Sequence, residues 1–156
     1  MTRRSEYGTG LDVAIMIPGV EPAFEAGEAQ PIDLEFVAQM VDVPTKALFA
    51  VRGYPKGSGI DYDQFEIARD SFALLGGYDG PMRGFPGCHS LRASSAMVGG
   101  PDGLSGSPVA RVLRRQDGSW AAALAGMVVM GGPERLHFVE VGTIMGVLKS
   151  ASNSQR

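Results

Sequence analysis

The segment Gly103-Leu104-Ser105-Gly106-Ser107-Pro108 carries residues whose types and spacing suit acyl-transfer chemistry. A serine acts as a nucleophile when its hydroxyl stands clear of the backbone and N–H groups converge on the oxyanion that forms. Small neighbours must also let a substrate carbonyl approach, and Gly103 and Gly106 stand on either side of Ser105. The same residue types also dominate ordinary surface turns, so the segment alone leaves both interpretations open.

Two other glycine-rich motifs fit this segment poorly. The nucleophile turn of α/β-hydrolases needs a glycine two residues after the serine, where this chain has Ser107, and no helical pattern follows. A phosphate-binding P-loop needs a lysine and a helix directly after the glycines, and neither is present. An anion-binding loop on a small β-barrel therefore stays a minor alternative.

The elements around this segment are expected to be short strands joined by many turns. The chain has 22 Gly and 10 Pro among 156 residues, with 44% hydrophobic and 20% charged residues, which predicts a packed domain of about eight to ten strands. An Asp117-Gly118 hairpin turn is predicted at residues 114–119, and residues 76–87 are predicted to form a surface loop. Strands are predicted at residues 11–17, 47–51, 91–98, 108–113 and 120–130, with one or two more within 31–44 and a strand or short helix at 64–75.

The last segment, residues 138–151, has a helical period. Its apolar side chains at i, i+3, i+4 and i+7 form one stripe, made by Val141, Ile144, Met145 and Leu148. The fold class expected from the residues is therefore all-β with one C-terminal amphipathic helix.

Charge and composition exclude several classes of partner. The net charge of −3 gives no basic footprint, so we expect no nucleic-acid partner. No window of about 18 apolar residues is present, so we expect no membrane span. The N-terminal MTRRSEYGTG lacks the apolar stretch of a signal peptide, and the compartment, cytoplasmic or exported, stays open.

The single cysteine, Cys88, rules out an internal disulfide and a cysteine-rich zinc site, so we expect neither a cofactor nor a metal. Cys88 is followed directly by His89, but neighbours on a strand point to opposite faces, which argues against a Cys–His nucleophile. We interpret Cys88 as a small buried or loop residue.

The motif GLSGSPV resembles the nucleophile signature of chymotrypsin-like (trypsin-like) serine proteases, usually written GDSGGP, with GxSGSP as a bacterial variant. Further matches follow in the order that this family has, and together they cover about residues 8–149. They are LDVAIMI for the strand of the catalytic aspartate, LFAVRGYPKG for the start of the second barrel, SSAMVGGPD before the serine and WAAALAGMVVMGG for the strand beside the substrate.

The resemblance implies a chymotrypsin-like Greek-key β-barrel: a complete second barrel, a remnant of the first, and the C-terminal helix. Residues 1–45 would be the remnant and connector, 46–151 the C-terminal barrel with its helix, and 152–156 a frayed tail. Such an enzyme cleaves peptide or protein substrates.

The resemblance also implies site residues. Ser105 would be the nucleophile, Asp12 would orient the histidine base, and the N–H groups of Gly103 and Ser105 would form the oxyanion hole. Gly99 would lie at the base of the specificity pocket, where an uncharged residue does not support a preference for Lys or Arg. Three residues would edge the cleft and pair with the substrate: Val129, Met130 and Gly131.

The histidine of this family is missing from the expected place. Its order along the chain is His, Asp, Ser, and none of the eleven residues before Asp12 is a histidine. His89 and His137 fall in regions that the family places away from the catalytic centre, so we interpret both as structural. Without a base, only the roughly 10³- to 10⁴-fold residual acceleration of an oxyanion hole and binding is expected. We therefore expect a poor protease or none, with a non-catalytic peptide-binding module that uses residues 127–131 as the alternative.

Three origins would explain this arrangement: a start site assigned too late, a degenerate remnant, or a first barrel and histidine supplied by another polypeptide or subunit. The intact Asp12 and Ser105 favour the first. In each case residues 11–17 would lack strand partners within the chain, so we expect them to pack irregularly on the barrel or to pair outside it.

Overall fold

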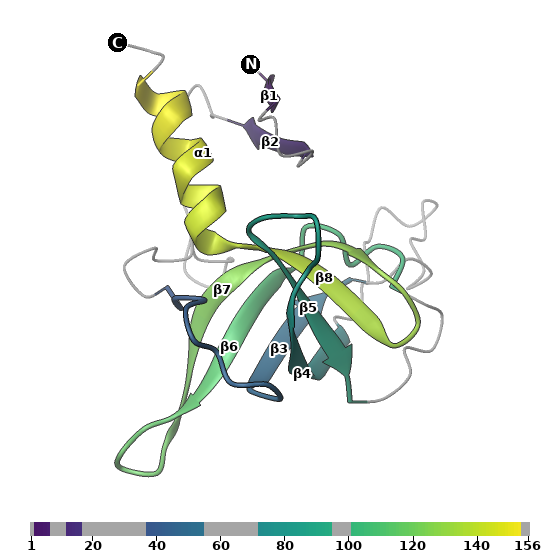
Figure 1. The fold of residues 1–156 in the computed structure, drawn as a ribbon, viewed down its shortest axis with the longest axis vertical. Coiled ribbons are helices and arrows are strands. Elements are labelled where there is room, and N and C mark those ends of the chain that lie inside the picture. Colours follow the sequence, from purple (N-terminus) through teal and green to yellow (C-terminus); the bar gives the residue numbers. More distant parts are fainter. Residues whose placement is uncertain (1, 7–11, 17–36, 55–71, 95–100, 154–156) are drawn as a thin grey trace, which may run out of the picture.

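The structure is a computed structural model that describes residues 2–6, 12–16, 37–54, 72–94 and 101–153. These residues form eight strands followed by one helix (Figure 1). The elements are β1 (Thr2–Glu6), β2 (Asp12–Met16), β3 (Leu48–Gly53), β4 (Phe72–Pro81), β5 (Cys88–Ala93), β6 (Pro108–Arg114), β7 (Trp120–Gly131), β8 (Arg135–Glu140) and α1 (Val141–Asn153).

Six of the strands close into an antiparallel barrel with the order β3-β4-β5-β8-β7-β6. The fourth strand of this barrel, β6, returns to lie beside the first, β3, which is the Greek-key arrangement. Closure leaves every barrel strand with two neighbours and removes the open edge that an isolated sheet would have. The prediction of a mostly β fold with one antiparallel barrel and a C-terminal helix is confirmed, but the described residues show no remnant of a second barrel.

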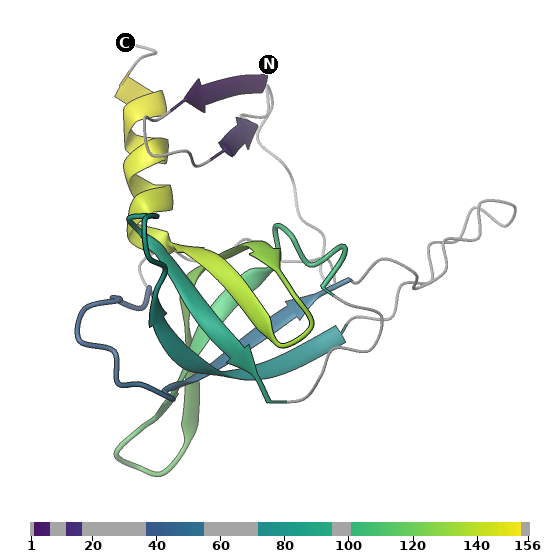
Figure 2. The same ribbon diagram turned by 45° about the vertical axis from the view of Figure 1, so that its right-hand side comes forward.

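The first two strands form a separate hairpin. β1 and β2 are antiparallel in register from Thr2 opposite Met16 to Glu6 opposite Asp12. The expectation that residues 11–17 lack a partner within the chain is therefore wrong for β2. The partner was missed because Arg3, Arg4 and Glu6 hide any alternation of apolar and polar residues in β1. Figure 2 shows this hairpin beside α1, and β2 contacts the helix.

Three further predictions differ from the structure. The surface loop predicted at residues 76–87 begins inside β4, because Leu74, Gly76 and Tyr78 alternate towards the core. A Cβ on Gly76 would lie 3.0 Å from the Arg92 carbonyl oxygen, so glycine lets β5 approach closely. The glycine-rich composition of residues 76–87 therefore indicated a turn, whereas the first part of this segment belongs to the closely packed strand β4.

The helix predicted from residue 138 begins at Val141, because residues 138–140 end β8. β8 alternates, with Leu136 and Phe138 buried beside the more exposed Arg135 and His137. This two-residue period was hidden by the helical period that follows it. β5 likewise begins at Cys88, three residues before the predicted start at Leu91.

The hairpin between β6 and β7 has the Asp117-Gly118 turn that its sequence predicts. The Gly118 N–H donates to the Arg115 carbonyl (3.0 Å), and the Ser119 N–H donates to Oδ1 of Asp117 (2.8 Å). Gly118 has a φ of +83°, in the left-handed region that favours glycine. The predicted strands at residues 47–51, 108–113 and 120–130 correspond to β3, β6 and β7.

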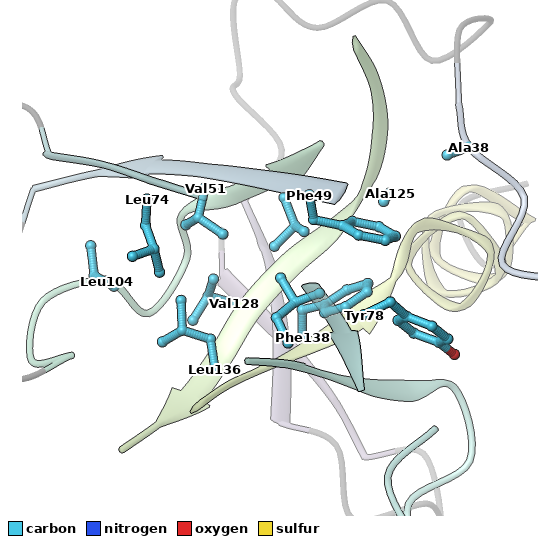
Figure 3. Close-up of a cluster of buried hydrophobic side chains, with 12 residues drawn as sticks. Ala38, Phe49, Val51, Leu74, Tyr78, Leu104, Ala125, Val128, Leu136 and Phe138 are labelled. Atoms are coloured by element: carbon cyan, nitrogen blue, oxygen red, sulfur yellow. The ribbon is translucent and has the colours of Figure 1, made fainter. Parts of the chain in front are cut away.

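The barrel interior is filled by apolar side chains from all six strands (Figure 3). The Phe49 ring lies between Tyr78 and Phe138, with ring centroids 5.8 Å away in each case. Leu104, from the loop before β6, is 1% exposed and belongs to the same core. The loop that carries Ser105 is therefore tied to the barrel through its neighbour.

Helix α1 continues directly from the end of β8 and contacts β7 and β8. Of the predicted apolar stripe, Val141 is buried and Ile144, Met145 and Leu148 are half-buried. Within the part of the chain that the structure describes, no helix is both long and apolar enough to cross a membrane.

Candidate active site

Two consecutive turns build the loop before β6. The Leu104 N–H donates to the Pro101 carbonyl (3.0 Å), and the Ser107 N–H donates to the Leu104 carbonyl (2.9 Å). The third residues of these turns, Gly103 and Gly106, each have a φ of +87°, as type II turns require. The two glycines that suggested a nucleophile loop are therefore also the residues that shape it.

The loop is anchored on both sides of Ser105. The Gly106 N–H donates to the Val128 carbonyl (2.8 Å), and the Val128 N–H donates to the Ser107 carbonyl (2.9 Å), which extends the β6–β7 ladder. Ser107 is buried against Gly53, where any side chain would overlap its Oγ. Between the buried Leu104 and these anchors, Ser105 is exposed to solvent.

The two N–H groups predicted to form an oxyanion hole are unengaged. Among the described residues, Leu104, Gly106 and Ser107 donate to backbone carbonyls, whereas the N–H groups of Gly103 and Ser105 have no such acceptor. Backbone donors without an internal partner are available to a developing negative charge.

The predicted substrate edge of β7 also lies beside this loop. β7 pairs with β8 along Val128–Gly131, with a bulge between Val128 and Met130 that contains Val129. On its other side the pairing with β6 ends at Met127, so within the described residues no strand covers that side of residues 129–131. Met130 is 45% exposed and Gly131 is exposed beside Pro101.

The structure does not describe the other two predicted site residues well enough to place them relative to Ser105. Asp12 begins β2, opposite Glu6, and its side chain lies outside the described part of the structure. Gly99 lies outside the described residues altogether. The predicted roles of Asp12 and Gly99 therefore stay predictions.

Neither histidine reaches Ser105, since each is engaged elsewhere. His89 is 8% exposed, accepts through Nδ1 from the Tyr78 hydroxyl (2.8 Å) and approaches Oε2 of Glu140 through Nε2 (3.2 Å). With a neutral ring, this geometry assigns the proton to Nε2, which donates to the carboxylate. Glu140 also accepts from the Thr143 hydroxyl (3.4 Å), so this Tyr78–His89–Glu140 network holds the start of α1 to the barrel.

The network also keeps neighbouring groups protonated. Burial, and secondarily the Glu140 carboxylate, raises the pKa of Tyr78 above its ordinary value of 10.0. The same two causes raise the pKa of the buried Cys88 thiol. A thiol held in its protonated form is a poor nucleophile, which agrees with the structural role expected for Cys88.

The second histidine forms a hydrogen bond that the sequence did not reveal. His137 of β8 lies opposite Ser90 of β5, with 2.9 Å between its Nδ1 and the Ser90 Oγ. Burial, then the nearby Arg135 charge, lowers the pKa of His137 below its ordinary value of 6.5, and Asp79 partly opposes this shift. Ser90 and His137 are 47 residues apart, so only the pairing of β5 with β8 could have identified them.

An open pocket of about 410 Å³ lies at the turn between β7 and β8. It is lined by Arg92, Gly132, Pro133, Glu134 and Arg135. In the described part of the chain, no group of three or more His, Cys, Asp and Glu side chains is suited to hold a metal ion. The structure thus offers an exposed serine on a shaped loop, an open strand edge beside it, and a separate Ser–His pair.

No family model, curated protein or solved structure matches this chain. The comparisons therefore assign no family.

Proposed function

We propose that this barrel is the substrate-binding barrel of a chymotrypsin-like serine endopeptidase, with Ser105 as its nucleophile. The observation that carries the proposal is the loop 101–107, which exposes Ser105 between two glycine turns that are anchored to β7. The Greek-key closure of six antiparallel strands, followed by a C-terminal helix, agrees with the barrel that the motifs imply.

The substrate would lie along the open side of Val129–Gly131. A peptide that adds as a strand gains main-chain hydrogen bonds there, and these depend little on its sequence. Because the β6–β7 pairing ends at Met127 and the anchored loop follows, such a peptide would pass close to Ser105. A scissile carbonyl would then lie near the nucleophile and the unengaged N–H groups of Gly103 and Ser105.

The reaction would be acyl transfer followed by hydrolysis. The Ser105 Oγ bonds to the carbonyl carbon while a base takes its proton, the C–N bond breaks, and the amine leaves with that proton. Water then attacks the ester and releases the acid and free serine. The described histidines are engaged elsewhere, so full turnover would need the histidine of a first barrel, from a longer chain or another subunit, with Asp12 orienting it.

A fluorophosphonate probe tests the nucleophile directly. Incubation of the chain with the probe, followed by peptide mass spectrometry, is expected to give an adduct at Ser105 that is lost in Ser105→Ala. The control is Ser119→Ala, which removes another exposed turn serine and should leave the adduct unchanged. The absence of any adduct at Ser105 in the folded protein, even when a His-bearing first barrel is supplied, would refute the proposal.

A non-catalytic peptide-binding module is the second candidate, favoured by the lack of a described base at Ser105. It predicts that extended peptides bind along residues 129–131 with the same affinity in the parent chain and in Ser105→Ala, without cleavage. Fluorescence anisotropy with a labelled peptide measures this. A Met130→Lys variant, altered on the exposed edge, should weaken binding in either case.

A further inference from the structure

The outer face of the barrel carries a second serine with a base already in place. In β5, Leu91 points into the core, so its neighbours Ser90 and Arg92 face outward. In β8, Leu136 and Phe138 point inward, so Arg135 and His137 face outward. The ladder sets Ser90 opposite His137 and Arg92 opposite Arg135, which makes two adjacent polar pairs.

We propose that Ser90 is a second acyl acceptor, with His137 as its general base, and that it reacts with small, uncharged carboxylic esters. The 2.9 Å between the Ser90 Oγ and His137 Nδ1 is the distance that direct proton transfer from a serine requires. This inference is independent of Ser105 and of the function proposed for it.

The protonation state of His137 suits this role. Burial and the Arg135 charge lower its pKa below 6.5, so the imidazole is mostly neutral at pH 7. In the tautomer that carries the proton on Nε2, Nδ1 can accept the hydroxyl proton of Ser90. The groups facing it are Asp79 from β4, Ser90 from β5, Arg135 from its own strand and the uncharged Met130 from β7.

A cation and a pocket lie beside the pair. The Arg135 guanidinium binds Asp79 at 3.2 Å, and this ion pair reaches across β5 because β5 lies between β4 and β8. Arg135 also lines the pocket of about 410 Å³, together with Arg92 and Glu134. A guanidinium can stabilise an oxyanion. Counting Asp79, which pairs with Arg135, the two guanidiniums are balanced by two carboxylates, so no net charge around the pocket favours a charged ester.

The chemical step balances without a cofactor. The Ser90 Oγ forms a bond to the ester carbonyl carbon as its proton moves to His137 Nδ1. The C–O bond to the alcohol then breaks, and the alcohol leaves with the proton from His137. Water attacks the acyl-serine in the same way and releases the carboxylic acid.

Acetyl transfer from p-nitrophenyl acetate tests this proposal. Release of p-nitrophenolate gives the rate, and mass spectrometry of the quenched protein locates the acetyl group. We expect acetylation of Ser90 that is abolished by Ser90→Ala and slowed about 10²-fold by His137→Gln, as removal of a general base predicts. The rate should rise with pH and reach half of its plateau value below about pH 6.5. Ser105→Ala is expected to leave the Ser90 adduct unchanged, so the two sites are distinguished.

A Ser90→Cys variant gives a second readout of the base, which can be used if the other variants misfold. If His137 acts as a base, iodoacetamide should alkylate Cys at position 90 faster than in Ser90→Cys/His137→Gln. The proposal is overturned if no acetyl group is found at residue 90, if His137→Gln leaves the rate unchanged, or if the two cysteine variants react equally.

Discussion

Some glycines allow neighbouring barrel strands to approach closely, and Gly126 of β7 is the clearest example. A Cβ there would overlap the Val139 carbonyl oxygen and press on the Phe138 ring. Gly126→Ala is therefore expected to destabilise the protein by about 2–3 kcal/mol, since backbone cannot give way as a flexible side chain does. Urea unfolding measures the change.

The matched control is Gly146→Ala in α1, where an added Cβ meets nothing within 4 Å. Alanine is the better helix former, so this variant should gain about 0.5–1 kcal/mol. If both variants have the same stability as the parent chain, the close approach of β7 and β8 at Gly126 is incorrect.

Tyr78 makes the stability of the protein sensitive to alkaline pH. At neutral pH, Tyr78→Phe should cost about 1–3 kcal/mol, because His89 Nδ1 loses its donor. Above pH 10.0 the unfolded chain releases the phenol proton, whereas the folded chain, with its raised pKa, retains it. The tyrosine's contribution to stability is thus present below pH 10 and falls as the pH rises further.

Urea unfolding at intervals from pH 7 to pH 11 checks this prediction. The advantage of the parent chain over Tyr78→Phe should shrink above pH 10. Tyr54→Phe, at a half-exposed tyrosine outside the network, is the comparison and should follow the parent curve. An advantage that does not change with pH would show that Tyr78 is not buried in the network described.

The paired turns of the loop 101–107 position Ser105. Gly106→Ala places a side chain at a φ of +87°, and Gly84→Ala does the same at +81° in another turn, with open space at both positions. The two variants should therefore lose a similar amount of stability, about 1 kcal/mol. Only Gly106→Ala should also lower fluorophosphonate labelling of Ser105, because only its turn carries that residue.

Thermal unfolding and the labelling rate, measured on the same samples, separate the two effects. Equal labelling in Gly84→Ala and Gly106→Ala would mean that the turn geometry does not set the reactivity of Ser105.

The sequence revealed those elements whose local pattern agrees with their place in the fold. The Asp117-Gly118 turn and strands β3, β6 and β7 were predicted because turn chemistry and apolar runs point the same way. β4 was missed in part because Gly76 serves close strand packing, while its composition indicates a turn. The candidate site divides in the same way: Gly103, Ser105 and Gly106 lie within one loop, so local sequence was enough to predict them. Ser90 and His137 meet only through the β5–β8 register, which no local pattern specifies.

Residues 37–153 hold every strand of the closed barrel and the described buried core. A chain that begins at residue 37 is therefore expected to unfold cooperatively in urea, with its midpoint lowered by less than about 1 M. Far-UV circular dichroism follows this transition. A broad, non-cooperative transition with strong binding of a hydrophobic dye would show instead that the barrel depends on the N-terminal hairpin.

Ser105 is proposed to be an acyl acceptor on a shaped loop, and the described histidines are engaged elsewhere. Free imidazole can act as an external base, so the decisive measurement is the rate of fluorophosphonate labelling at Ser105 with and without imidazole, resolved by peptide mass spectrometry. We expect slow labelling that imidazole accelerates in the parent chain, with no adduct at residue 105 in Ser105→Ala. Folded protein that gives no Ser105 adduct under either condition would contradict this proposal.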